Sequence, residues 1–232
     1  VGTLQPIAAI AAIAHEHGAL VHTDAAQSVG KIPVNVSDLG ADLLSVAGHK
    51  LYAPKGVGAL YVRAGVKLAK FMHGADHEAD RRAGTENVPG IVALGEAAAL
   101  AARDLGANLG HLRAMRDRLG AALRGAFPPC QMRFHTPTTG CLPNTLSVGF
   151  RGVEANALLE AIGDRVAASA GAACHSDAIT LSHVLAAMRV PVEYAMGTLR
   201  LSVGTPTTAE EIDAAAEAII AAVRRLMPEA AD

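Results

Sequence analysis

Aromatic residues are scarce in this sequence: 232 residues include four phenylalanines, three tyrosines and no tryptophan. Proteins that bind nucleic acids rely largely on stacking platforms and a basic field. Here few rings are present and the formal net charge is -2, so we expect no nucleic-acid binding by the chain itself. Long apolar runs without charges are also missing, and the sequence therefore predicts no membrane span.

Cysteine is scarce as well, with only Cys130, Cys141 and Cys174 present. An odd and small number disfavours a disulfide framework and is typical of a reducing compartment. Because the three are widely spaced, without a Cys-x-x-Cys pair, a structural zinc site is also disfavoured. The first six residues show no basic segment followed by an apolar one, so no signal peptide is visible and we expect a cytoplasmic protein.

The hydrophobic content of 51% is sufficient for a buried core, and its pattern predicts an α/β chain. In the first part we expect strands at 19–23, 43–47 and 57–62, preceded by a helix at 5–17 and followed by one at 88–105. We place a boundary near residue 107, which gives domains of 1–107 and 108–232.

The second domain alternates again between helix and strand. We expect helices at 108–126, 153–162 and about 180–188, and strands at 144–150, 166–169 and 198–203. A last helix should begin where Thr207 and Thr208 precede Glu210 and Glu211, a pattern typical of a capping box.

One lysine follows an expected strand in a distinctive setting. Lys50 comes directly after Gly48 and His49 and precedes a Gly/Pro-rich connection, where a loop residue can be held at a strand end. Upstream, Asp24 ends another expected strand, and Gln27 follows it. Pyridoxal phosphate (PLP) needs a lysine for its Schiff base and an acid that keeps the pyridinium nitrogen protonated. Each residue alone would suit a surface position, but together they predict a PLP site.

Several segments around these residues resemble the cysteine desulfurases, which belong to the class V aminotransferases among the fold-type I PLP enzymes. The similar segments are, in chain order, His22-Thr-Asp24-Ala-Ala-Gln27-Ser-Val-Gly-Lys, Gly48-His49-Lys50, Arg82-Ala-Gly-Thr85-Glu-Asn-Val, Ser169-Ala-Gly-Ala-Ala-Cys174-His-Ser-Asp and Thr198-Leu-Arg200-Leu-Ser-Val-Gly. The segment with Cys174 is also similar to selenocysteine lyases, a close branch. The resemblance covers nearly the whole chain and implies part of a large PLP-binding domain at 1–107 and a small C-terminal α/β domain at 108–232.

The resemblance implies cofactor contacts for five residues. Lys50 would carry the Schiff base, and Asp24 would hold the ring nitrogen. Gln27 would contact the ring hydroxyl and His49 the phosphate. Thr85 would reach the phosphate of the neighbouring subunit, which implies a homodimer. A serine that commonly adds a phosphate contact two residues before the histidine is Ala47 here, so one hydrogen bond is expected to be lost.

The resemblance also implies two residues that act on the substrate. Cys174, in a run of small residues that would fill a core pocket badly, would be a mobile nucleophile. Arg200 would bind the amino acid carboxylate, which a planar guanidinium fits in a bidentate way. An arginine that is common just after the following glycine is replaced by Thr205, so the carboxylate role rests on Arg200 alone.

Other polar and sulfur-containing residues have plainer interpretations. Cys130 and Cys141 are typical of structural, buried cysteines. The segment His73 to Asp80 contains two histidines and two aspartates, but its turn-like residues do not present both imidazoles on one helix face. We expect a solvated loop there and no metal site.

The resemblance implies an enzyme that converts L-cysteine to L-alanine and holds the sulfur as a persulfide on Cys174. The resemblance implies transfer of that sulfur to an acceptor protein or thiol, as in iron–sulfur cluster biogenesis. Two alternatives stay open: a selenocysteine lyase acting on L-selenocysteine, and an inactive PLP-fold binding partner. A class V transaminase or lyase would give Cys174 no role.

The chain resembles only the C-terminal part of the family. Val1 to Pro6 resembles a point well inside the large domain, and neither the phosphate-cradling turn nor the ring-stacking histidine of the family is found. We therefore expect either a fragment or a protein whose other half is a separate chain.

Overall fold

The computed structural model describes residues 1–175 and 178–227, without the side chains of 172–180. The chain divides into two compact units. The N-terminal unit comprises Gln5–Ala107, and the C-terminal unit comprises Asn108–Asp232 together with Val1–Leu4.

The first four residues pack with the C-terminal unit, although the sequence placed them in the first domain. The Leu142 amide donates to the Gly2 carbonyl and the Leu4 amide to the Gly140 carbonyl, both at 2.8 Å. These are backbone bonds between segments distant in sequence, which no local side-chain pattern announces.

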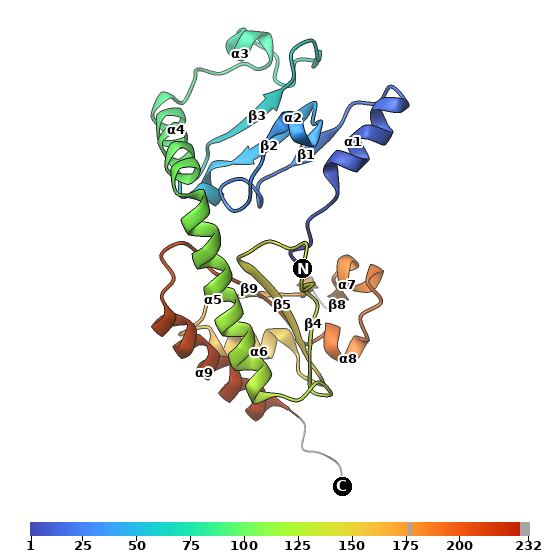
Figure 1. Cartoon of the computed structure of the whole chain (residues 1–232), viewed down its shortest axis with the longest axis vertical. Helices are drawn as coiled ribbons and strands as arrows, with labels where there is room; N and C mark the ends of the chain where they lie inside the picture. Colours follow the sequence, from blue (N-terminus) through green and yellow to red (C-terminus); the bar gives the residue numbers. More distant parts are fainter. Residues whose placement is uncertain (176–177, 228–232) are drawn as a thin grey trace. The chain divides into compact units, whose positions relative to one another are not determined.

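The N-terminal unit contains a three-stranded sheet in the order β1-β2-β3 (Figure 1). Its elements are α1 (Ile7–Glu16), β1 (His22–Asp24), α2 (Val36–Leu39), β2 (Leu43–Ala47), the 3-10 turn η1 (Gly48–Leu51), β3 (Gly58–Val62), α3 (His77–Asp80) and α4 (Val88–Arg103). Strand β1 runs parallel to β2, whereas β3 is antiparallel to it. The expected strands and both expected helices are therefore confirmed, with β1 shorter than predicted.

Local sequence explains where α4 begins. The Asn87 side chain accepts a hydrogen bond from the Gly90 amide at 3.2 Å, and Pro89 lies in the first turn, where its missing amide costs no helical hydrogen bond. The helix buries Ala97, which joins Leu51 and Ala53 in a small apolar cluster. This cluster lies directly beneath the turn that follows β2.

The C-terminal unit contains a four-stranded antiparallel sheet in the order β4-β5-β9-β6. Its elements are α5 (Leu105–Ala126), β4 (Met132–Phe134), β5 (Thr145–Phe150), α6 (Ala155–Ile162), β6 (Ser169–Ala170), β7 (Ala172–His175), β8 (Ala178–Leu181), α7 (His183–Ala187), α8 (Val192–Ala195), β9 (Thr198–Ser202) and α9 (Ala209–Leu226). The predicted capping box at α9 is confirmed: the Thr208 hydroxyl accepts from the Glu211 amide at 3.2 Å, and the Glu211 carboxylate accepts from the Thr208 amide at 2.9 Å.

Alternation along β5 and β9 divides this sheet into an apolar face and a polar face. Val148 pairs with Leu199 and Leu146 with Leu201, and these side chains are buried in the core that α5, α6 and α9 form with the sheet (Figure 1). On the opposite face Ser147 pairs with Arg200. The predicted outward direction of Arg200 is confirmed, since its side chain is exposed while both neighbours in β9 are buried.

A buried histidine lies beside the polar face. The Thr198 hydroxyl donates to the Tyr194 carbonyl at 2.9 Å, so the His135 Nε2–H must be the donor in its 3.0 Å bond to Thr198 Oγ1. The other nitrogen, Nδ1, is buried without a hydrogen-bond partner among the described residues. Burial of the ring, more than the nearby Arg133 guanidinium, lowers the pKa of His135 to about 4.

The segment that carries Cys174 differs from the expected loop. Its backbone forms strand β7, which is antiparallel to β8, and Cys174 is paired with Ile179 in the backbone register. The helix expected near 180–188 begins only at His183, because β8 extends to Leu181. Short elements such as α2, β4 and α8 were not predicted, since three or four residues show no clear periodicity.

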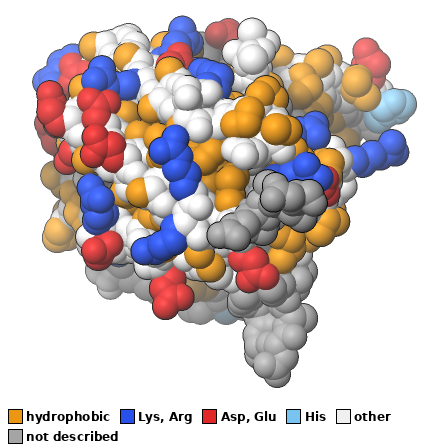
Figure 2. Space-filling model, turned by 90° about the horizontal axis from the view of Figure 1, so that it is seen from below, with side chains coloured by type: hydrophobic (Ala, Val, Ile, Leu, Met, Phe, Trp, Pro, Cys, Tyr) orange, Lys and Arg blue, Asp and Glu red, His pale blue; other side chains and the backbone are white. Residues whose placement is uncertain are grey.

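Charged side chains of both signs are interspersed on the face shown in Figure 2, in keeping with the small net charge. Among residues 1–175 and 178–227, no helix is long and apolar enough to cross a membrane.

Candidate functional site

The first candidate residue, Asp24, is the last residue of β1 and is exposed. Its Oδ1 accepts a hydrogen bond from the Ala26 amide at 2.9 Å, which fixes the carboxylate against the turn that follows the strand. Gln27 lies in this turn, which is closed by bonds from the Ser28 and Val29 amides to the Ala25 carbonyl. Asp24 and Gln27 are therefore presented just beyond the carboxyl end of β1.

His49 and Lys50 lie in the turn η1, directly after β2. Leu51 is 5% exposed and anchors the turn in the apolar cluster beneath it, so the two preceding side chains project outward and are exposed. Gly48 permits a close approach here, because a Cβ at this position would lie 2.7 Å from the Val57 carbonyl oxygen. The sequence at this turn thus places a lysine rigidly at a strand end.

These residues meet at one edge of the sheet because β1 and β2 are parallel neighbours. Asp24 pairs with Ser45, and both the Asp24 turn and the Lys50 turn follow the carboxyl ends of their strands. Ligand sites of open α/β sheets lie at such edges. The structure therefore brings together Asp24, Gln27, His49 and Lys50, four of the residues singled out by the sequence.

Lys31 connects the segment after the Asp24 turn to the Lys50 turn, through a contact that the sequence did not predict. Its Nζ donates to the Lys50 carbonyl at 3.4 Å. Burial, followed by the charge of Lys50, lowers the pKa of Lys31. The preceding Gly30 also packs closely on this turn, since a Cβ there would lie 2.5 Å from Leu51 Cδ2.

Two further groups of polar contacts support this sheet. His22 Nε2 lies 2.8 Å from Ser45 Oγ, across the β1–β2 pair. At the other end of β2, the fully buried Asp42 accepts from the Val21 amide at 2.7 Å, lies 2.9 Å from His15 Nε2 and forms an ion pair with Arg63. The Val21 hydrogen bond, followed by His15 and Arg63, lowers the pKa of Asp42. An isolated aspartate before an apolar run gives no sequence signal for such contacts.

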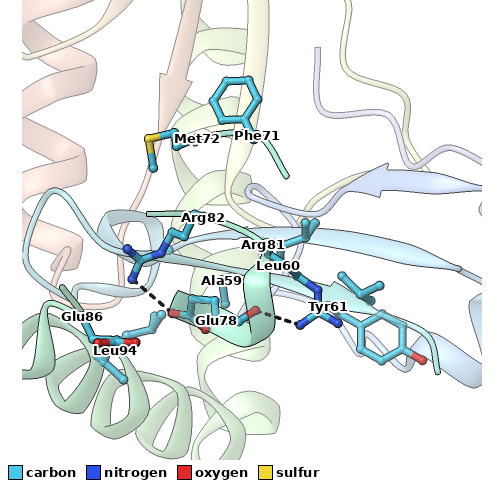
Figure 3. Close-up of a pocket in the computed structure, with 13 residues that line it drawn as sticks. Ala59, Leu60, Tyr61, Phe71, Met72, Glu78, Arg81, Arg82, Glu86 and Leu94 are labelled. Atoms are coloured by element: carbon cyan, nitrogen blue, oxygen red, sulfur yellow. Dashed lines mark hydrogen bonds and ion pairs between the residues drawn. The ribbon is translucent and has the colours of Figure 1, made fainter. Parts of the chain in front are cut away.

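Thr85 is exposed in the loop before α4, away from the Lys50 turn in the sequence. Arg82 shapes the loop, with Nη1 donating to the Gly84 carbonyl at 2.6 Å and Nη2 lying 3.3 Å from Glu78 Oε1. A cavity of about 850 Å³ lies beside β3. Arg82 and Glu78 are among the residues that line it (Figure 3). Thr85 itself does not line it.

The segment considered for metal binding has different contacts. Lys70 Nζ lies 2.6 Å from carboxylate oxygens of both Asp76 and Asp80, and His77 Nδ1 lies 3.0 Å from Glu86 Oε1. Within the described part of the chain, no group of three or more metal-ligating side chains is found.

The remaining candidates belong to the C-terminal unit. Arg200 lies in the middle of β9, and its Nη2 donates to Ser169 Oγ at 3.1 Å. The Cys174 side chain lies outside the described residues. The expectation of a buried Cys130 is wrong, because this thiol is exposed in the turn after α5, whereas Cys141 is partly buried. Cys130 follows Pro128 and Pro129 in an exposed turn, so the thiol is exposed although cysteine is an apolar residue.

The α/β fold is that of the fold-type I PLP-dependent transferases, as the comparisons show. The model of the aminotransferase class-V family matches residues 1–215. The chain belongs to this family, which is PLP-dependent.

Within this family, the chain is similar to proteins named as cysteine desulfurases and to solved NifS-like structures. The chain is 45% identical to a cysteine desulfurase of Gluconacetobacter diazotrophicus over 98% of this chain and 57% of the relative. It is 43% identical to the cysteine desulfurase IscS of Methanosarcina thermophila, over 97% of this chain and 55% of the relative. A NifS-like protein from Rickettsia africae superposes with a TM-score of 0.87 at 29% identity, over 96% of this chain and 59% of the other. The chain thus spans little more than half the length of these relatives.

Proposed function

We propose that this chain carries a large part of a PLP-dependent cysteine desulfurase, which converts L-cysteine to L-alanine and passes the sulfur on. The parallel pair β1–β2 is the observation that carries the proposal, because it puts Asp24 and the Gly48-His49-Lys50 turn at one sheet edge. The names of the relatives at 45% and 43% identity support this activity over others of the family.

The exposed groups at this edge fit the cofactor chemically. When bound, PLP supplies an electron sink for a carbanion at the substrate Cα. Lys50 would hold the cofactor, and its amine would act as the general base that removes the Cα proton. The Asp24 carboxylate would keep a proton on the ring nitrogen, while Gln27 and His49 would bind the ring hydroxyl and the phosphate.

Sulfur transfer is assigned to the C-terminal unit. The Cys174 thiolate attacks the substrate sulfur, so that the S–S bond of a persulfide forms as the substrate Cβ–S bond breaks. The electron pair of the broken Cβ–S bond stays on the substrate. Protonation of Cβ converts it into a C–H bond, which yields alanine. The exposed Arg200 guanidinium binds the substrate carboxylate.

The proposal includes a homodimer, in which Thr85 reaches the phosphate held by the other subunit, and a sulfur acceptor that is a protein or a small thiol, as in iron–sulfur cluster biogenesis. It also includes a cytoplasmic location, since a persulfide-forming thiol requires a reducing compartment. Selenocysteine is the less favoured substrate, because the relatives named above are cysteine desulfurases.

Cys174→Ser tests the proposal, since a hydroxyl is a poor nucleophile toward sulfur. The cofactor-loaded parent, treated with L-cysteine, should release alanine and gain one sulfur atom on the Cys174 peptide, as seen by mass spectrometry. The variant should keep its cofactor absorbance but gain no sulfur. Sulfur on Cys130 or Cys141 instead, or desulfuration at the parent rate by the variant, would contradict the assignment. A parent without cofactor absorbance would favour an inactive binding partner.

A further inference from the structure

Arg200 belongs to a row of side chains that crosses three neighbouring strands. In the register, Arg200 of β9 pairs with Ser147 of β5 on one side and with Ser169 of β6 on the other. Directly paired residues in a sheet point to the same face, so all three side chains lie on the polar face. Ser169 Oγ accepts the hydrogen bond from Arg200 Nη2 at 3.1 Å.

This hydrogen bond restrains a side chain that the backbone alone would leave free. A guanidinium lies at the end of a long flexible stem, and its rotamer entropy opposes any single orientation. Arg200 forms no ion pair within 1–175 and 178–227, so its charge remains available to a ligand. One bond to Ser169 leaves the other N–H groups of the fork for a carboxylate.

The hydrogen bond has a simple cause in the fold. Strand β6 is only two residues long, Ser169–Ala170, and it pairs with Arg200 and Leu199. Ala168 and Ala170, on either side of Ser169, pack against the core on the opposite face, so a slip of β6 by one residue would turn Ser169 toward the core. The core therefore also determines that Ser169 faces Arg200.

We propose that Ser169 is a positioning residue, which orients the Arg200 guanidinium for the carboxylate of an amino acid substrate. This inference rests on the proposed role of Arg200 as the carboxylate-binding residue. Ser169 does not touch the reacting atoms. Its effect should therefore fall on the affinity for ligands with a carboxylate and leave ligands without one unaffected.

The test uses two ligands that differ only at the carboxylate, L-alanine and L-alaninamide. Each is titrated into the cofactor-loaded protein, with binding followed by the change in cofactor absorbance. Ser169→Ala should weaken L-alanine binding by about three- to tenfold, the range expected for one lost hydrogen bond, and leave L-alaninamide binding unchanged. Ser169→Thr, which keeps the hydroxyl, should bind both ligands as the parent does.

Two further variants make the outcomes distinguishable. Ser202→Ala, an exposed serine on the same face of β9, is the control and should bind both ligands like the parent. Arg200→Ala should weaken L-alanine binding more than Ser169→Ala does. If Arg200→Ala discriminates between the ligands and Ser169→Ala does not, the positioning role of Ser169 is overturned while Arg200 keeps its role. If Arg200→Ala affects both ligands equally, the proposed carboxylate site is wrong, and the inference about Ser169 fails with it.

Discussion

Replacing Gly48 by alanine should damage the lysine turn through a single added methyl group. A Cβ there would lie 2.7 Å from the Val57 carbonyl oxygen, 3.1 Å from Val57 Cγ1 and 3.3 Å from the Ala53 Cβ. The nearest of these atoms belongs to the backbone. The same carbonyl accepts a 3.0 Å hydrogen bond from the Gly48 amide, so it cannot retreat without stretching that bond.

The size of the effect follows from this crowding. Overpacking of a well-packed site costs about 1–3 kcal/mol in the free energy of unfolding. The N-terminal unit, Gln5–Ala107, is of a size at which 1 kcal/mol lowers the melting temperature by roughly 4–8 °C. Gly48→Ala should therefore lower the melting temperature by roughly 5–20 °C. Cofactor occupancy should fall as well, because Lys50 lies two residues away in the same turn.

Gly95→Ala, in the same unit, is the matched control. Gly95 lies inside α4, and a Cβ there would meet no atom within 4 Å. Alanine is a better helix former than glycine by about 1 kcal/mol, so this variant should melt roughly 4–8 °C higher than the parent and keep its cofactor. Thermal unfolding by circular dichroism and cofactor absorbance would measure both effects. If Gly48→Ala melts and binds cofactor like the parent, the turn is not fixed by its contact with Val57, and the reasoning is wrong.

Three other predictions concern separate features of the chain. Lys50→Ala should lose the label left by borohydride reduction of the cofactor-loaded protein; peptide mapping that finds the label on Lys31, Lys55, Lys67 or Lys70 would contradict this. Protonation would put a proton on Nδ1 of His135, which is buried without a hydrogen-bond partner among the described residues. The stability that depends on neutral His135 is therefore fully present above the ordinary histidine pKa of 6.5 and should be lost progressively as the pH falls toward about 4. His135→Gln should flatten that dependence in melting curves recorded between pH 7 and 4.5, and an unchanged dependence would exclude His135 as its source. The intact, cofactor-loaded protein should sediment as a dimer, and Thr85→Ala should weaken cofactor retention; a fully active monomer would refute the shared site.

The sequence was most informative where a local pattern fixes a local structure. Strand β2 begins and ends where predicted, because Leu43 to Ala47 is a short apolar run between turn-forming residues. The capping box at Thr208 was predicted for the same reason, since all its partners lie within one helical turn. Asp24, His49 and Lys50 remain predicted site residues, and each lies at or just after the end of such a strand.

Contacts between distant segments could not be predicted in the same way. Ser169 and Arg200 are 31 positions apart, and only the pairing of β6 with β9 brings them together. Asp42 looks like an ordinary residue before a strand, yet its partners His15, Val21 and Arg63 come from three other segments. Such contacts depend on strand order and register, which a single sequence does not reveal.

The candidate residues are therefore held in two physically different ways, and their variants should show different signatures. Lys50 is positioned by its backbone, in a turn closed by Gly48 and anchored by Leu51, so disturbing the turn must disturb the fold beneath it. Arg200 projects from the polar face of a sheet whose core lies on the opposite side, and its guanidinium is restrained by the hydrogen bond that it donates to Ser169 Oγ. Changes at Gly48 should then lower stability and cofactor binding together, whereas changes at Ser169 should lower affinity for the carboxylate at nearly constant stability.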